Sequence, residues 1–273
     1  MTSLHIGVAQ IHSGGTPAEN FARLERQVRA AGILGVEVLL FAECSLHGYS
    51  GQMNVESVRA VAETIDGPQC MAIRRLAQKE NISLLVGFFE KEGDRFYNSQ
   101  LVAYADGRVA VQRKYNLTPT ELGAGLTPGP HQRQIFTFKG IQTIINICSD
   151  KDIVELPKGV NPKDIRYQFA PCAGGGTMGE MLTARELKTP EGRKRFTENK
   201  PRVFLPNPFH EPSCLPHAGL AATNALGPVG KETCHQGHGL IIDTDQVIRA
   251  QTPGTIVLEH QQDQMIHAVI DFD

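Results

Sequence analysis

The chain has 273 residues, 41% hydrophobic and 21% charged, which is the composition of a globular protein with a sizeable core. Its formal net charge of -2, with basic residues scattered along the chain, argues against nucleic acid as a partner. No apolar run is long enough to cross a membrane and the start MTSLHIGVAQ lacks a secretion pattern, so we expect a cytoplasmic protein with free thiols.

The first third of the chain alternates between strand and helix patterns. Buried strands show as short, nearly continuous apolar runs, and helices show as apolar residues at helical spacing. The predicted elements are a strand over 5–10, a helix over 20–34, a strand over 36–41, a helix over 68–80 that Asn81 caps, and a strand over 82–89. This alternation predicts right-handed βαβ units in a partly parallel sheet.

The remainder of the chain is richer in hairpin patterns, in which two apolar runs flank a short polar turn. The predicted hairpins join 97–104 to 109–113 and 134–138 to 141–147, and closing strands follow at 203–205, 239–242, 247–251 and 265–270, with a turn at 243–246. Residues 171–181 are small and Gly-rich, and the charged stretch 182–200 is typical of a helix with one solvated face.

These patterns favour one α/β domain over residues 1–273. The predicted strands are numerous enough for two sheets, and helices alternate with them along the chain. This combination indicates two mixed sheets packed face to face with the helices outside. The predicted fold is therefore a four-layer αββα sandwich.

Three chemically capable side chains each stand where a predicted strand ends. Glu43 follows the strand over 36–41, Lys114 ends the run VAVQRK, and Cys148 follows the apolar run IQTIINI. Taken singly, each has a plain structural explanation: a helix cap or salt bridge for Glu43, an exposed edge charge for Lys114, and an inert packed thiol for Cys148. Together they are candidates for one site, because strand ends on one edge of a sheet can converge.

The residues around these three positions resemble the nitrilase superfamily of carbon–nitrogen hydrolases. The similarity lies in FAEC around Glu43, RKYNLTPTE around Lys114 and NICSD around Cys148, and it extends to HIGVAQ, YNSQLVAYADGRVAVQRK and GHGLIIDTDQVIRAQ. The resemblance implies the αββα fold and a catalytic triad of Glu43, Lys114 and Cys148. In that chemistry Glu43 moves protons, the Cys148 sulfur attacks carbon, and Lys114 stabilises the tetrahedral intermediate.

The same resemblance suggests substrate-binding roles for three further residues. Glu121 falls on a loop glutamate of the family and would position the substrate or the attacking water. The backbone N–H of Ser149 would help to hold the oxyanion. Asp150 is more typical of the amidase and carbamoylase branches than of true nitrilases. We therefore expect a small amide or N-carbamoyl compound as substrate, no cofactor, and a homodimer or a higher homo-oligomer.

The match has departures that bear on the substrate. Ala42 stands where the family usually has proline, and Asn116 where it often has histidine. The stretch CSDKDIVELPK replaces the usual aromatic residue and compact acidic loop after the cysteine, and the Gly-rich segment 172–180 is unusual. Nitrile hydrolysis, acyl transfer to an amine, and a non-catalytic binding protein of the same fold therefore stay open as alternatives.

A metal site is a further alternative to a thiol-dependent hydrolase. The pairs Cys214 with His217 and Cys234 with His238 have ligand-like spacing, although His217 and His235 would also suit the rim of a substrate site. The Gly-rich segment lacks the Gly-Lys-Ser/Thr sequence of a phosphate-binding loop. We expect no metal in the site and no nucleotide.

Overall fold

A computed structural model describes residues 2–152, 155–174, 176–199, 215 and 217–272. The first sheet is built from β1 (Thr2–Gln10), β2 (Val38–Phe41), β3 (Ser83–Glu92), β4 (Arg95–Ala103), β5 (Val109–Arg113) and β14 (Gln264–Phe272), in the order β14-β1-β2-β3-β4-β5. Strands β1, β2 and β3 are parallel, and the outer pairs are antiparallel. The sheet is therefore mixed, as the sequence predicts.

The second sheet has the same mixed design. It contains β6 (Phe136–Phe138), β7 (Ile141–Ile145), β8 (Ile165–Cys172), β9 (Gly219–Asn224), β12 (Gly239–Ile242) and β13 (Ile248–Thr252), in the order β13-β12-β9-β8-β7-β6. Strands β7, β8 and β9 are parallel. A separate hairpin joins β10 (Leu226–Val229) to β11 (Thr233–Gln236).

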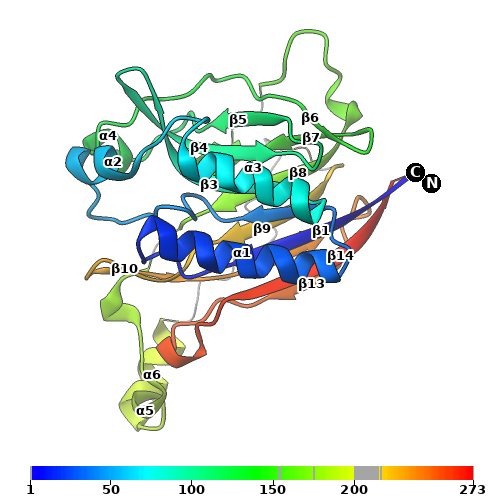
Figure 1. The fold of residues 1–273 in the computed structure, drawn as a ribbon. Coiled ribbons are helices and arrows are strands. Elements are labelled where there is room, and N and C mark those ends of the chain that lie inside the picture. The colour runs from blue at the N-terminus through cyan, green and yellow to red at the C-terminus, as the bar shows by residue number, and fades with distance from the viewer. Residues whose placement is uncertain (1, 153–154, 175, 200–214, 216, 273) are drawn as a thin grey trace.

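The helices are α1 (Pro17–Ile33), α2 (Val55–Val61), α3 (Pro68–Glu80), α4 (Pro119–Gly123), α5 (Ala184–Leu187) and α6 (Pro190–Glu198). Helices α1 and α3 lie side by side over the outer face of the first sheet (Figure 1). Asn81 ends α3 in a left-handed conformation, which confirms the predicted cap. No described helix combines the length and apolarity of a membrane span.

Two apolar layers hold this architecture together. One lies between the sheets and joins β1 and β2 side chains such as Ile6 and Leu40 to Phe169 and Ile241 of the second sheet. The other joins the buried stripe of α1, centred on Leu24, to the outer face of the first sheet. Burying one such large side chain contributes about 1.5–3 kcal/mol. This arrangement confirms the predicted sandwich of two mixed sheets with helices outside.

The structure adds to the sequence prediction and corrects it in the second half of the chain. Strands β8 and β9, at the centre of the second sheet, were not predicted. The predicted helix over 182–200 is two short helices, because Pro190 lacks the N–H to continue α5 and instead begins α6, with Thr189 as its cap. The predicted strand over 203–205 lies outside the described residues.

Candidate active site

The three predicted residues come together at the ends of their strands, and two of those strands, β2 and β5, run in the same direction within the first sheet. Glu43 lies two residues after β2, Lys114 directly follows β5, and Cys148 lies three residues after β7. Parallel strands bring their carboxyl ends to one edge, and β5 shares the direction of β3 because β4 is antiparallel to both. The topology therefore collects residues that lie more than a hundred positions apart.

Gly87 of β3 allows the Glu43 segment to lie directly on the neighbouring strand. A Cβ atom at this position would lie 2.2 Å from the backbone nitrogen of Cys44 and 2.6 Å from the carbonyl oxygen of Ala42. Real side chains do not approach backbone atoms this closely, so only glycine fits without moving the segment. The position of Glu43 thus depends on a residue that has no side chain.

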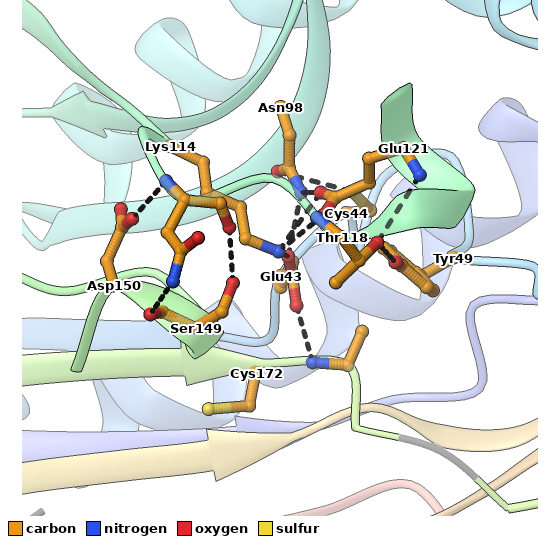
Figure 2. Close-up of polar contacts among 12 residues, drawn as sticks. Glu43, Cys44, Tyr49, Asn98, Lys114, Thr118, Glu121, Ser149, Asp150 and Cys172 are labelled. Atoms are coloured by element: carbon orange, nitrogen blue, oxygen red, sulfur yellow. Dashed lines mark hydrogen bonds and ion pairs between the residues drawn. The ribbon is translucent and has the colours of Figure 1, made fainter. Parts of the chain in front are cut away.

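Lys114 lies between two carboxylates in the interior (Figure 2). Its Nζ donates to Oε1 of Glu43 at 2.7 Å and to Oε2 of Glu121 at 2.9 Å, and all three side chains are at most 1% exposed. Charges at this depth persist only when they are paired and hydrogen-bonded. The structure therefore brings the predicted Glu43, Lys114 and Glu121 into direct contact.

Electrostatics keep this lysine charged. Burial by itself would lower the pKa of the Lys114 ammonium, but the Glu43 carboxylate and the Cys148 thiol outweigh burial and raise that pKa above its usual value. Glu121 acts in the same direction. The site therefore presents a fixed positive charge within electrostatic reach of the Cys148 sulfur.

Asn98 of β4 bridges the two carboxylates and was missed by the sequence analysis. Its Nδ2 donates to Oε1 of Glu43 at 2.7 Å and to Oε1 of Glu121 at 2.6 Å, while its Oδ1 accepts from the Cys44 thiol at 3.4 Å. The available signal was an asparagine in a strand, where asparagine is otherwise disfavoured. Its contacts show that it fixes the spacing of the two acids.

Each carboxylate also accepts a hydrogen bond from a backbone N–H group. The second oxygen of Glu43, Oε2, accepts from the N–H of Ala173 at 2.8 Å, just beyond β8. Oε2 of Glu121 accepts from the N–H of Thr118, whose hydroxyl caps the start of α4. Glu43 therefore links the first sheet to the second, and Glu121 is held in place by its own helix.

Cys148 differs from the other cysteines that the structure describes. It is partly exposed, whereas Cys44, Cys70, Cys172 and Cys234 are buried. It begins the 3₁₀ helix η1 (Cys148–Asp152) with a left-handed φ of 48°, an uncommon conformation for a non-glycine residue that is often found at functional sites. The turn brings the thiol out of the core at the end of β7.

Ser149 and Asp150 lie against the loop that follows Lys114. The Ser149 hydroxyl donates to the carbonyl of Asn116, whose side chain donates back to the Ser149 carbonyl (Figure 2). The buried Asp150 carboxylate accepts from the backbone N–H groups of Tyr115 and Asn116 and pairs with the buried Arg133 at 2.7 Å. Arg133 was not predicted, because a lone arginine in a loop gives no signal of burial.

His217, named as a possible metal ligand, and His235, named for the rim of a substrate site, both have other contacts. His217 lies 3.0 Å from the carbonyl oxygen of Pro162, and the buried His235 lies 2.7 Å from that of Tyr49. Cys214 lies outside the described residues. Within the ranges described, no group of three or more His, Cys, Asp or Glu side chains could hold a metal ion.

Comparisons with known proteins place the chain in a family. The family model described as "Carbon-nitrogen hydrolase" matches residues 5–182. A citrullinase of Francisella tularensis is 28% identical over 64% of this chain and 63% of its own length, and an (R)-stereoselective amidase of a Pseudomonas species is 28% identical over 45% and 42%. The aligned part thus spans less than two thirds of these relatives.

Solved structures share the fold over nearly the whole chain. A CN-hydrolase superfamily protein from Xanthomonas campestris has a TM-score of 0.71 and 18% identity, over 99% of this chain and 91% of its own. An amidase from a Nesterenkonia species has a TM-score of 0.64 and 18% identity, over 98% and 90%. At this sequence identity, the similarity shows that the sandwich fold is shared.

Proposed function

The chain belongs to the carbon–nitrogen hydrolase family, and on that premise we propose that it hydrolyses a non-peptide C–N bond of a small amide or N-carbamoyl compound through a Cys148 thioester. One observation carries the proposal: a buried lysine, held between two carboxylates, lies within electrostatic reach of a partly exposed cysteine. A base, a fixed cation and a nucleophile in one place are what cysteine-dependent acyl transfer requires.

In the first half of the reaction, Glu43 accepts the thiol proton and the Cys148 sulfur attacks the carbonyl carbon. The carbonyl oxygen becomes an oxyanion, which the Lys114 ammonium stabilises because its raised pKa keeps it protonated. The backbone N–H of Ser149 is a second donor, and one such donor commonly contributes about 3 kcal/mol. Glu43 then returns the proton to the leaving nitrogen, and ammonia or an amine departs.

In the second half, water replaces the sulfur. Glu43 takes a proton from the water as it attacks the thioester, and the same oxyanion site stabilises the second intermediate. Collapse of that intermediate releases the acid and returns the proton to Cys148. The net reaction adds one water across the C–N bond.

Glu121 and Asp150 support this chemistry by holding other groups. Both oxygens of Glu121 lie within 3.0 Å of Lys114 Nζ, so we assign Glu121 to positioning the lysine, with contact to the substrate or the water as its second role. Asp150 has its oxygens on Arg133 and on two backbone N–H groups. Its contacts favour positioning of the loop after Lys114 over the substrate contact expected from the sequence.

The substrate class rests on the names of the relatives and on the family. Citrullinase is named for citrulline, whose side chain ends in a carbamoylated nitrogen, and the second relative is named an amidase. Other relatives are named nitrilases, and a nitrile carbon could be attacked by the same sulfur. An amine in place of water would give acyl transfer at the same residues.

The test is release of ammonia or amine by the purified protein from a panel of small amides, N-carbamoyl amino acids and nitriles. We expect release from an amide or an N-carbamoyl compound, and its loss in Cys148→Ala. Cys234→Ala is the matched control, because it removes a cysteine whose contacts lie elsewhere, with Gln261. Release that survives in Cys148→Ala would refute the thioester, and release from nitriles alone would replace the amide proposal.

A further inference from the structure

A second thiol lies beside Cys148 at the end of the adjacent parallel strand. In the register of β7 and β8, Ile145 faces Phe169, and the N–H of Asn146 continues the pairing by donating to the Phe169 carbonyl at 2.9 Å. Cys148 and Cys172 each lie three residues beyond that facing pair. Neighbouring strands lie about 4.8 Å apart, and disulfides join Cα atoms that are about 4.4–6.8 Å apart.

The two side chains are in contact. Cys148 packs against the apolar cluster that contains Cys172, Ala170 and Leu220. The neighbouring Cys148 side chain, followed by burial, raises the pKa of the Cys172 thiol, which therefore stays protonated beside its neighbour. Cys172 is 2% exposed and Cys148 is partly exposed, so a small reagent from solvent meets Cys148 first.

Cys44 also lies near the site, but it contacts other residues than Cys148. Its sulfur donates to Oδ1 of Asn98 at 3.4 Å, and it packs with Val58 and Phe89 in a different apolar cluster. Figure 2 shows Cys172, by contrast, at the end of β8, next to the N–H that binds Glu43. The two thiols that lie side by side are therefore Cys148 and Cys172.

We propose that Cys148 and Cys172 form a reversible disulfide when a peroxide oxidises Cys148, which makes this pair a modification site. The proposal rests on the proposed function in one respect, namely that Cys148 is a reactive thiolate.

Two steps complete the oxidation. In the first, the Cys148 thiolate attacks the peroxide, the O–O bond breaks, and sulfenic acid and hydroxide (or an alkoxide, which takes up a proton) result. In the second, the Cys172 sulfur displaces the sulfenic hydroxyl, its proton leaves with that hydroxyl as water, and the S–S bond forms. The two thiols supply the two electrons that reduce the peroxide, and an added dithiol returns them.

This disulfide has two consequences for the site. It removes the nucleophile, so hydrolysis stops while the bond is intact. It also captures the sulfenic acid before a second peroxide converts it to sulfinic acid, which a dithiol does not reduce.

The experiment is thiol mapping of the purified protein after treatment with hydrogen peroxide. The protein is alkylated under denaturing conditions, digested, and analysed by mass spectrometry with and without dithiothreitol. We expect a linked pair of peptides that contain Cys148 and Cys172 and that separate on reduction. Sulfinic acid on Cys148 without the linked pair, or a link from Cys148 to Cys44, would overturn the proposal.

Variants make the assignment specific. In Cys172→Ala, dimedone should trap sulfenic acid on Cys148, and longer exposure should give oxidation that dithiothreitol does not reverse. Cys172→Ser serves as a second variant if the alanine protein fails to fold, and Cys70→Ala, which removes a buried cysteine of α3, should keep the link. Full recovery of the Cys148 thiol by dithiothreitol after the longer exposure, in both Cys172 variants, would also refute the proposal.

The mapping is independent of any substrate. A linked pair in a protein that hydrolyses nothing on the panel would support the disulfide and count against the hydrolase. Hydrolysis that depends on Cys148, in a protein that forms no link, would leave the proposed function standing and remove the disulfide.

Discussion

Replacing Lys114 by methionine would leave two buried carboxylates without their shared cation. At 2.7 and 2.9 Å, each contact between Lys114 and a carboxylate is worth about 6 kcal/mol at an effective dielectric constant of about 20. Desolvation offsets much of this attraction, and removing one partner of a buried pair typically costs about 3–5 kcal/mol. We therefore expect Lys114→Met to lower the free energy of unfolding at pH 7 by that amount.

A second substitution separates stability from chemistry. The double variant Lys114→Met, Glu121→Gln has only one unpaired buried carboxylate in place of two. Most of the lost free energy of unfolding should therefore return. Hydrolysis should not return, because the oxyanion still lacks its cation, and both proteins should be about 100- to 1000-fold slower than the parent. The deficit of the single variant should also shrink at lower pH, since a proton on one carboxyl group relieves the repulsion.

Urea denaturation followed by circular dichroism, together with initial rates on the best substrate of the panel, measures both quantities. An unchanged free energy of unfolding in Lys114→Met would show that the three charges are not buried together. Full activity in the double variant would remove Lys114 from the stabilisation of the oxyanion.

Three further substitutions test other parts of the structure. Burial lowers the pKa of His47 from 6.5 to about 4, so the unfolded chain binds more protons than the folded protein between these two pH values. The free energy of unfolding should therefore fall by about 3 kcal/mol as the pH drops from 6.5 to 4. Urea denaturation of His47→Gln should show a smaller fall over the same pH range. Arg133→Met leaves the buried Asp150 carboxylate unpaired and should cost about 3–5 kcal/mol, seen as a lower melting temperature; an unchanged melting temperature would contradict this burial. Ser149→Ala removes one hydroxyl hydrogen bond to a backbone carbonyl and should slow hydrolysis less than about tenfold, whereas a loss as large as that of Cys148→Ala would give the hydroxyl a part in the reaction.

Helix α1 and strand β2 were predictable because their patterns are local. The stripe that includes Leu24 and Val28 predicts α1, and the apolar run before Glu43 predicts β2. The central strands β8 and β9 were missed because their sequences lack such a local pattern. β8 includes Gln168 and Pro171, and β9 is largely small residues, so neither shows the β-branched or alternating pattern of an ordinary strand.

The residues of the candidate site likewise differ in whether a local pattern could predict them. Glu43, Lys114 and Cys148 could be proposed because each follows a recognisable strand, and the family resemblance then supplied their roles. Asn98 and Arg133 depend on partners that are distant in the sequence: the amide of Asn98 spans two carboxylates, and the buried guanidinium of Arg133 pairs with Asp150. Local patterns carry no information about such pairings.

The close approach of Gly87 to the strand end that carries Glu43 has a consequence for engineering. A library aimed at new substrates would naturally vary residues near Glu43, and Gly87 lies among them in space. Even alanine at this position would push on the backbone of residues 42–44 and carry the base away from Lys114. Randomisation should therefore spare Gly87 and fall on exposed positions of the loop after Lys114, where a new side chain can alter substrate choice without displacing the acids.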